Sequence, residues 1–521
     1  MKREKIISNI SNSTQYYDIA IIGGGATGVG TAVEAASRGY DVILIEQSDF
    51  GKGTSTRSTK LAHGGVRYLQ QGNISLVFDA LKERGIMRNN APHLVHDLPF
   101  IVPIYDWWEG PFYGIGLKVY DMLAGKAGFG SSKFLSKEET LKLIPTVETK
   151  GLKGGVIYHD GQFNDARLLI NLVQTAEEQG ATMLNYVKAI SFTKEKDQLN
   201  GIVAHDVETG MEFDIKAKVI INATGVFTDS IRKMDDQQAT EIMTSSQGVH
   251  LVLDSSFLPG NSGIMVPNTE DGRVLFAVPW KNHTLVGTTD TFVNSYPLEP
   301  IALESEINFL LEHAAKYLTK DPKRSDVKSV FAGLRPLVKN GNNNDNDTAS
   351  ISRDHLITIS KSGLISIAGG KWTTYRKMAE DTVDQAILQS DLPDSKSVSS
   401  KLQIHGYHMN AYIYGSLSSY GSDANKINEL LSEKKEYNEL LHPDHTIKIG
   451  EIVWAIRNEM ARNIEDFLAR RTQLLILDAK ASIEVAPIVA KIMAKELRYG
   501  RRWRKNQIQQ YNEMTKNYIL V

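Results

Sequence analysis

The 521-residue chain contains no cysteine. This absence excludes disulfide bonds, thiolate nucleophiles, cysteine-ligated zinc and iron–sulfur clusters. A redox enzyme with this sequence must therefore take its electron chemistry from an organic cofactor, or from a metal that is held without thiolates. The absence also fits a cytoplasmic location.

Long hydrophobic runs and a large net charge are missing as well. No run of about 18 apolar residues occurs, so a membrane-spanning helix is not expected. The formal net charge is −2, and we therefore expect no nucleic-acid partner. Residues 1–16 carry basic side chains but no long apolar core and no cleavage site, so we predict a short disordered leader.

The length and composition are those of an ordinary globular protein with several domains. A chain of 521 residues is too long for a single hydrophobic core, which predicts two to four domains. Apolar residues make up 41% of the chain and charged residues 23%, as is typical of globular proteins.

The most informative pattern is "YYDIAIIGGGATGVGTAVEAASRGYDVILIEQSDF", which runs from residue 16 to residue 50. Residues 18–22 are apolar and rich in β-branched side chains, as expected of a buried parallel strand. A G-x-G-x-x-G motif and a predicted helix follow, and Gly39 is placed to end that helix. Residues 42–45 predict a second strand.

This order of elements has a physical reason. Gly23 permits a tight turn, Gly25 lets a pyrophosphate approach the backbone, and Gly28 lets the helix pack closely on the strand. The helix N-terminus offers free N–H groups to phosphates. Glu46, at the end of the second strand, is placed to accept hydrogen bonds from a ribose. The segment therefore predicts a dinucleotide site, without deciding between FAD and NAD.

Two later segments are predicted to return to this cofactor. Residues 217–229 form an apolar strand that ends in the small residues Ala223, Thr224 and Gly225. Residues 363–387 form a strand, a Gly-Gly turn and a helix that starts near Thr373. The N-terminus of that helix could face negative charge on a reduced flavin. Each segment could instead be an ordinary βα turn without a ligand.

Four cations lie in settings that are unusual for surface charges. Arg67 follows Gly-Gly, Arg335 lies between apolar residues and a proline, Arg353 follows a low-complexity loop, and Lys371 follows Gly-Gly. Each alone could be a buried ion-pair partner. Together they predict convergence on a dianion such as a phosphate ester, because guanidinium groups bind phosphate oxygens in a bidentate manner.

Several segments in this order resemble the FAD-dependent glycerol-3-phosphate dehydrogenase family, within the D-amino-acid-oxidase-like flavoproteins. The resemblance covers most of the chain and lies in "GTSTRSTKLAHGGVRYL" (53–69), "ERGIMRNNAPHL" (83–94), "LKGGVIYHDGQFNDARL" (152–168), "INATGVFTD" (221–229), "GVHLVLD" (248–254), "VGTTDT" (286–291), "AGLRPL" (332–337), "SRDH" (352–355), "AGGKWTTYRKMAE" (368–380) and "ARNIEDFLARRTQLLILD" (461–478).

The resemblance implies an α/β fold with a Rossmann-like FAD-binding domain, an antiparallel-sheet substrate domain and a C-terminal helical domain. The expected ranges are 17–85, 161–235 and 346–385 for the FAD-binding domain, 86–160 and 236–345 for the substrate-binding cap, and 386–521 for the helical domain. Within the last range, Ile456, Met460, Ile464 and Leu468 have the spacing of a buried helix face.

The motifs and the resemblance together give the expected site residues. The cofactor, non-covalent FAD, is expected to contact Gly23, Gly25, Ala26, Thr27, Gly28, Glu46, Gln47, Ser58, Lys60, Leu61, His63, Gly64, Gly65, Val187, Ala223, Thr224, Gly225, Gly370, Lys371, Trp372 and Thr373. The substrate is expected to contact Arg67, Tyr68, Arg353 and Lys371. No metal is expected.

The implied reaction is oxidation of sn-glycerol 3-phosphate to dihydroxyacetone phosphate, with hydride transfer from C2 to the flavin. Arg335 is expected to stabilise alkoxide charge at the C2 hydroxyl. Because arginine stays protonated, His63 and His250 are the candidate bases. His63 could instead only contact FAD, and His250 could have only a structural role.

The resemblance further implies a quinone acceptor, a homodimer and peripheral attachment to the cytoplasmic face of the inner membrane. Residues 104–130 and 495–505 are aromatic or basic enough to lie at a lipid interface, although domain packing would explain them equally well. An oxidase that passes electrons to O2 is the first alternative. It is disfavoured because the chain is shorter than expected for glycerophosphate oxidases, which carry an extra insertion. A non-catalytic flavin-binding module is the second.

Overall fold

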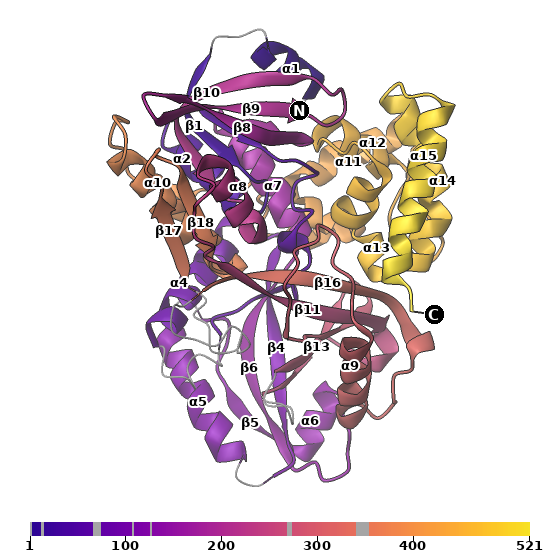
Figure 1. Cartoon of the computed structure of the whole chain (residues 1–521). Helices are drawn as coiled ribbons and strands as arrows, with labels where there is room; N and C mark the ends of the chain where they lie inside the picture. The colour runs from indigo at the N-terminus through magenta and orange to yellow at the C-terminus, as the bar shows by residue number, and fades with distance from the viewer. Residues whose placement is uncertain are drawn as a thin grey trace.

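The computed structural model describes residues 3–11, 15–65, 74–106, 109–125, 128–267, 274–339 and 354–520. Two sheets and a C-terminal group of helices make up the described chain (Figure 1). The predicted α/β fold class is confirmed. The domain boundaries given above stay predictions.

The first sheet has a parallel core around the strand that precedes the glycine motif. β1 pairs in parallel with β10 on one side and β2 on the other, and β18 and β7 extend the parallel part. Its eight strands are β1 (Tyr16–Ile22), β2 (Val42–Ile45), β7 (Thr182–Leu184), β8 (Val187–Glu195), β9 (Gln198–Asp206), β10 (Glu212–Asn222), β17 (His355–Ile359) and β18 (Ile365–Gly369).

The second sheet is antiparallel apart from one parallel pair, β4 with β12. Its ten strands are β3 (Leu61–Ala62), β4 (Val95–Ile104), β5 (Lys133–Ser136), β6 (Gly154–Phe163), β11 (Met243–Asp254), β12 (Gly263–Val266), β13 (Leu275–Trp280), β14 (His283–Gly287), β15 (Thr291–Phe292) and β16 (Val327–Val338). The antiparallel strands predicted for the cap are therefore present, together with helices that the sequence analysis did not predict there.

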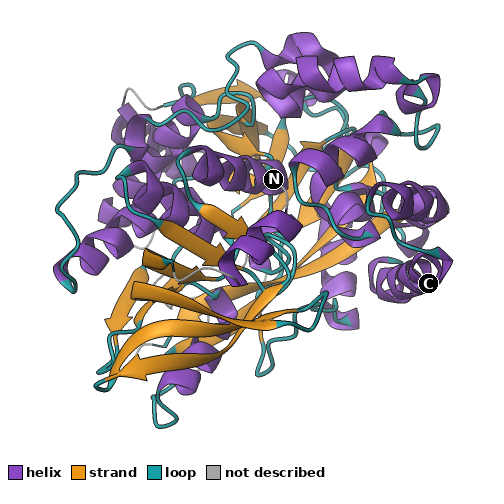
Figure 2. Cartoon of the chain, turned by 90° about the horizontal axis from the view of Figure 1, so that it is seen from above, coloured by secondary structure: helices purple, strands orange, loops and turns teal. Residues whose placement is uncertain are grey.

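Helices cover both sheets and fill the C-terminal part of the chain (Figure 2). They are α1 (Arg3–Ser11), α2 (Ala26–Ser37), α4 (Ile74–Asn90), α5 (Glu109–Ala124), α6 (Lys137–Leu143), α7 (Asp165–Glu178), α8 (Thr228–Asp235), α9 (Glu304–Tyr317), α10 (Tyr375–Leu388), α11 (Ala424–Glu433), α12 (Gly450–Asn458), α13 (Leu474–Leu477), α14 (Ala479–Glu496) and α15 (Arg501–Thr515). Among the described residues, none of these helices combines the length and the apolar character needed to cross a membrane.

The hydrophobic cores tie these layers together. α2, α7 and α10 pack on one face of the first sheet, and α1, α8 and the β8–β9 hairpin cover the other face. One face of the second sheet packs on the C-terminal helices, and the other packs on α6 and α9. The C-terminal helices thus contact the second sheet and also reach the loops of the first, as Figure 1 shows on its right side.

The structure corrects two predictions. The leader is not disordered over residues 3–11, because α1 buries Ile7 and Ile10 and the buried Arg3 donates through Nε to the carbonyl of Asn185 at 2.9 Å. The helix predicted through residues 456–468 ends at Asn458, since Met460 has a positive φ of 52°. Met460, Ile464 and Leu468 are nevertheless buried, so their spacing reflected the core and not one continuous helix.

Candidate functional site

A cavity of about 620 Å³ lies between the two sheets. Its first wall comes from the carboxyl ends of β1, β2 and β10, and its second wall comes from β11 and β16. The carboxyl ends of parallel strands are where α/β folds bind ligands, and the volume is within the range of small-molecule sites, roughly 300–1,000 Å³.

The glycine motif has the close contacts that its spacing predicts. Gly23 has a φ of +114°, and a Cβ atom there would lie 2.6 Å from the carbonyl oxygen of Ala223. A Cβ atom on Gly28 would lie 1.9 Å from the carbonyl oxygen of Gly23. A Cβ atom on Gly25 would meet only Ser55 Oγ, at 3.2 Å. Gly23 and Gly28 therefore permit close packing, and Gly25 leaves the helix N-terminus open to the cavity.

Glu46 lies at the end of β2 and lines the cavity, as predicted. Its two carboxylate oxygens accept hydrogen bonds from the backbone N–H groups of Gly24 at 2.7 Å and Ser48 at 2.8 Å. Burial, which is the largest cause, raises the pKa of this carboxyl above its usual value. These contacts fix the orientation of the side chain at the end of the cavity that Gln47 and Val187 also line.

The part of the cavity that Arg335 lines is formed where β11 pairs with β16. Ser246 lies opposite Arg335 in this pairing, and Gly248 lies opposite Gly333. Alternate residues of a strand share a face, so Ser246, Gly248 and His250 all point to the same side. A Cβ atom on Gly248 would lie 2.4 Å from Arg335 Nη2. The glycine thus makes room for the guanidinium group.

Polar groups on three sides hold the Arg335 guanidinium. Nη2 donates to Thr288 Oγ1 at 2.9 Å and to the carbonyl of Thr289 at 2.7 Å. Nη1 donates to Ser246 Oγ at 3.2 Å and lies 3.4 Å from Asp290 Oδ1. Its side chain is 19% exposed and lines the cavity. A cation with this many bonds is fixed in position before any ligand arrives.

His250 is buried in the same wall. Its ring stacks on Phe331 with centroids 5.0 Å apart, and Nε2 lies 2.8 Å from Thr59 Oγ1. Nδ1 has no hydrogen-bond partner among the residues that the structure describes. Burial, and then the charges of Arg335 and Lys60, hold the pKa of His250 well below its usual value. The ring is therefore neutral near pH 7.

The Gly-Gly turn after β18 forms the third part of the wall. Gly369 and Gly370 both have a φ of +78°, a conformation that favours glycine. Lys371, Trp372 and Thr373 follow them along the cavity. Thr373 Oγ1 donates to the carbonyl of His63 at 3.5 Å, so this turn lies beside the histidine at the start of the 63–65 segment. The helix predicted near Thr373 begins as α10, at Tyr375.

The structure brings most of the predicted site residues together in this single cavity. The predicted residues that line it are Gly23, Gly25, Ala26, Thr27, Glu46, Gln47, Ser58, Leu61, His63, Val187, Ala223, Thr224, Gly225, His250, Arg335, Gly370, Lys371, Trp372 and Thr373. Arg67, Tyr68 and Arg353 lie outside the described residues.

Four predicted cofactor residues lie behind the wall instead. Gly28 packs on Gly23, as described above. Lys60 is fully buried, and its Nζ forms an ion pair with Asp165 at 2.7 Å. The backbone N–H of Gly64 donates to the Tyr120 hydroxyl at 2.8 Å, and Gly65, which follows it, is also buried. These residues support the loops of the site without lining the cavity.

Sequence analysis gave no role to several residues that shape the site. Thr59, in "GTSTRSTKLAHGGVRYL", contacts His250. Thr288, in "VGTTDT", and Gly248, in "GVHLVLD", both contact Arg335. Each of these partners lies far along the chain. Ser55 Oγ accepts a hydrogen bond from the N–H of Ala26, at the start of α2, at 2.9 Å. Only the density of small hydroxyl residues in 53–59 could have pointed to it.

The residues present fit a dinucleotide. One end of the cavity has an open helix N-terminus and the fixed carboxylate of Glu46, and the other has the fixed guanidinium of Arg335 and the imidazole of His250. At the helix N-terminus, a Cβ atom on Gly25 would meet only Ser55 Oγ, so the backbone there is open to a ligand. A long ligand with a phosphate-rich middle would match this order of groups.

Comparisons with known families agree with this geometry. A family described as FAD dependent oxidoreductase matches residues 18–376. A second, described as the C-terminal domain of alpha-glycerophosphate oxidase, matches residues 364–505. The two matches together cover nearly all of the described chain.

Individual relatives match over almost the full length. The mitochondrial glycerol-3-phosphate dehydrogenase of Macaca fascicularis is 39% identical, over 97% of this chain and 74% of the relative. That of Schizosaccharomyces pombe is 38% identical, over 95% and 86%. A crystal structure of the glycerol-3-phosphate dehydrogenase from Bacillus halodurans complexed with FAD has a TM-score of 0.81 at 30% identity, and covers 99% of this chain and 97% of that one.

Proposed function

Because this chain belongs to the FAD-dependent oxidoreductases and, among them, to the family of glycerol-3-phosphate dehydrogenases, we propose that it oxidises sn-glycerol 3-phosphate to dihydroxyacetone phosphate. The observation that carries this proposal is the shared cavity, in which the dinucleotide fingerprint and Arg335, Lys371 and His250 line one space. A bound flavin and a small phosphate ester would meet there.

The residues proposed to contact the substrate have two roles, one at the phosphate and one at the C2 hydroxyl. Arg67 and Arg353 are proposed to hold the phosphate, since guanidinium groups suit a dianion, and Tyr68 and Lys371 are proposed to lie near the substrate. Arg335 is proposed to lie at the C2 hydroxyl of the substrate and to stabilise the negative charge that forms as the hydroxyl loses its proton. When bound, FAD would supply a two-electron acceptor, at its N5, for the hydride that leaves C2.

His250 is the proposed acceptor of the hydroxyl proton. The residue lines the cavity, and its ring is neutral near pH 7. The hydrogen bond to Thr59 and the stack on Phe331 fix the ring. His63 also lines the cavity, and it remains the second candidate for this role.

Replacing His250 by asparagine should lower the rate of flavin reduction about 10²- to 10⁴-fold at saturating substrate, because general-base catalysis contributes about that much. The matched variant His63→Asn should change that rate far less. In the unmodified protein the rate should stay level as the pH falls from 8 toward 6.5, because the lowered pKa keeps His250 neutral throughout. Stopped-flow absorbance measures both. Equal losses in the two variants, or a midpoint near 6.5 that disappears in His250→Asn, would contradict the assignment.

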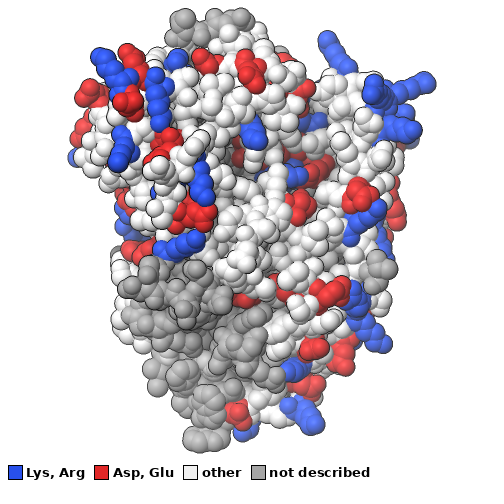
Figure 3. Space-filling model, in the orientation of Figure 1, with Lys and Arg blue, Asp and Glu red and all other residues white. Residues whose placement is uncertain are grey.

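The electron acceptor is proposed to be a quinone, with the protein attached peripherally to the cytoplasmic face of the inner membrane. Two surfaces support attachment. Large apolar side chains are exposed on α4, α5 and β5: Ile74, Phe78, Met122 and Phe134. Exposed cations surround the α14–α15 turn, where Figure 3 shows a group of Lys and Arg side chains at the upper right: Lys495, Arg498, Arg501, Arg502 and Lys505.

These two surfaces lie at opposite corners of the molecule, since α5 is at the lower left of Figure 1 and α15 at the upper right. Tyr499 and Trp503, which the sequence offered to the lipid, stack on each other at 4.8 Å, and the Tyr499 hydroxyl accepts a hydrogen bond from Arg462. That packing favours the apolar surface on α4, α5 and β5.

An experiment with lipid vesicles separates the proposed acceptor from oxygen. Enzyme reduced by glycerol 3-phosphate is mixed with vesicles that contain a quinone, or with air-saturated buffer alone. We expect fast reoxidation by the quinone vesicles, slow oxygen uptake and sedimentation of the enzyme with the vesicles. Rapid, stoichiometric oxygen uptake with peroxide release would instead identify an oxidase. Oxygen is the alternative to test because residues 364–505 match a family described as the C-terminal domain of alpha-glycerophosphate oxidase.

A further inference from the structure

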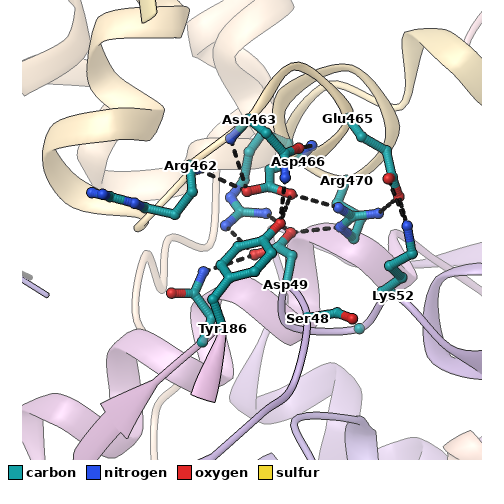
Figure 4. A network of polar contacts seen from close by, with 12 residues as sticks. Ser48, Asp49, Lys52, Tyr186, Arg462, Asn463, Glu465, Asp466 and Arg470 are labelled. Atoms are coloured by element: carbon teal, nitrogen blue, oxygen red, sulfur yellow. Dashed lines mark hydrogen bonds and ion pairs between the residues drawn. The ribbon is translucent and has the colours of Figure 1, made fainter. Parts of the chain in front are cut away.

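The C-terminal segment 459–473, named here the clamp segment, reaches the loop that follows β2. Figure 4 shows its side chains converging on Asp49, Lys52 and Tyr186. Asp49 is fully buried and lies in loop 46–52, which lines the cavity through Glu46, Gln47, Gly51 and Lys52. The clamp segment itself does not line the cavity.

Two consecutive arginines of the clamp segment hold Asp49. Arg470 Nε lies 2.5 Å from Asp49 Oδ2. Arg471 donates from Nη1 to Oδ2 at 2.6 Å and from Nη2 to Oδ1 at 3.0 Å, which is a bidentate pair. The two arginines lower the pKa of Asp49 to about 2 against the opposing effect of burial, so the carboxylate stays ionised.

A second set of contacts ties the clamp segment to the edge of the cavity. Lys52 Nζ lies 2.6 Å from Glu465 Oε2, and Arg470 Nη1 lies 2.7 Å from Glu465 Oε1. The Tyr186 hydroxyl donates to Asp466 Oδ1 at 2.6 Å. Lys52 lines the cavity itself, and Tyr186 precedes Val187, which also lines it.

The clamp segment also contacts α7 and, through Asp165, the cavity-lining Ser58. Arg167 Nη1 lies 2.5 Å from Glu459 Oε1, and Arg167 Nη2 donates to the carbonyl of Arg471 at 3.0 Å. Gln473 Nε2 donates to Asp165 Oδ1 at 3.2 Å, and the other oxygen of Asp165 accepts from Ser58 Oγ at 2.8 Å. Ser58 lines the cavity.

Opposite charges pair within this network. The carboxylates of Asp49, Glu459, Glu465 and Asp466 pair with Lys52, Arg167, Arg470 and Arg471. Removing one partner of a buried pair leaves an uncompensated charge, which is strongly destabilising locally. Loop 46–52 would relax first, because its one fully buried acid is held from outside by the clamp segment.

We propose that the clamp segment holds loop 46–52 in the shape that receives the dinucleotide, so that FAD affinity is coupled to the docking of the C-terminal helices. Arg470, Arg471 and Glu465 are positioning residues in this scheme. The proposal rests on the proposed function only in taking FAD as the ligand, and it makes no use of the substrate. Such coupling is reciprocal, so bound FAD also stabilises the docked helices.

The test measures how tightly the purified holoenzyme retains FAD, without substrate. Holoenzyme is diluted and ultrafiltered, and free FAD is measured to give an apparent Kd. For Arg471→Met we expect the Kd to rise at least about 5-fold, the lower limit of typical coupling. Arg471→Lys, which keeps the charge but loses the bidentate geometry, should lie in between. Arg457→Met, on α12, removes an ion pair with Glu496 on α14, outside this network, and it should leave the Kd for FAD unchanged.

Two further readouts separate positioning from a purely structural role. At saturating FAD, the KM for glycerol 3-phosphate should match that of the unmodified protein. Glu465→Gln, at the partly exposed edge of the network, should raise the Kd for FAD in the same direction, and it decides the matter if Arg471→Met does not fold. An unchanged Kd in folded variants that only unfold at lower urea concentration would overturn the proposal. Loss of FAD by the unmodified protein would count against the proposed function instead.

Discussion

Replacing Arg335 by methionine should lower the rate of flavin reduction by glycerol 3-phosphate about 10²- to 10³-fold, the usual cost of losing one fixed donor to a developing oxyanion. Four polar groups hold the guanidinium against the cavity, and it therefore needs no reorganisation as alkoxide charge forms at C2. FAD content should not change, because the bonds of Arg335 go to β11 and to residues 288–290. Anaerobic stopped-flow absorbance measures the rate, and the flavin-to-protein absorbance ratio measures the content.

The control for this prediction is Arg335→Lys. Lysine keeps the positive charge but cannot form the same fork of bonds to Thr288 and Thr289, so the rate should be intermediate. An Arg335→Met enzyme with an unchanged rate would remove this residue from the chemistry. A parallel loss of FAD and rate would place it among the cofactor contacts.

Replacing Gly28 by alanine should raise the Kd for FAD about 5- to 150-fold. The added Cβ atom would lie 1.9 Å from the backbone oxygen of Gly23, and backbone on both sides cannot move aside as a flexible side chain can. Overpacking of this kind costs about 1–3 kcal/mol, and 1.4 kcal/mol is a factor of ten in affinity. Because the displaced helix N-terminus is the proposed phosphate site, that cost falls on cofactor binding.

The matched control is Gly116→Ala, another glycine-to-alanine change inside a helix. Gly116 lies in α5, and a Cβ atom there would meet no atom within 4 Å. This variant should keep its FAD. Ultrafiltration of both holoenzymes compares them, and equal retention of FAD would contradict the packing role given to Gly28.

Local patterns in the sequence predict the first half of the site well. The strand at 42–45 has the predicted bounds, and β1 extends the predicted strand by two residues. The reason is that a buried strand, a glycine turn and a helix are adjacent in sequence, so that short-range sterics determine all of them. The turn at Gly369 and Gly370 follows the same logic.

The other half depends on pairings between distant segments. Arg335 faces Ser246 because β11 and β16 pair in one particular register, and the register of a sheet is not written in either strand alone. The room that Gly248 leaves for the guanidinium becomes visible only once that register is known. Lys60 depends on a distant segment in the same way. It was predicted to contact the cofactor, but its side chain pairs with the buried Asp165, which lies far along the chain.

The wrong prediction of a helix through residues 456–468 has a similar origin. A spacing of four residues from Ile456 to Leu468 fits one helix, yet the helix ends at Asn458 and Met460 has a positive φ. Met460, Ile464 and Leu468 are buried beyond its end. The alternating charges of 459–473 resemble a solvated helix face in sequence. In the structure they are buried because loop 46–52 and α7 supply opposite charges.

The central claim is that this cavity brings glycerol 3-phosphate and a bound flavin together for two-electron transfer. Anaerobic mixing of the purified holoenzyme with glycerol 3-phosphate tests it most directly, with glycerol as the control that lacks the phosphate. We expect loss of the flavin absorbance band and one equivalent of dihydroxyacetone phosphate per flavin, and no change with glycerol. A flavin band that persists with glycerol 3-phosphate while FAD stays bound would contradict it.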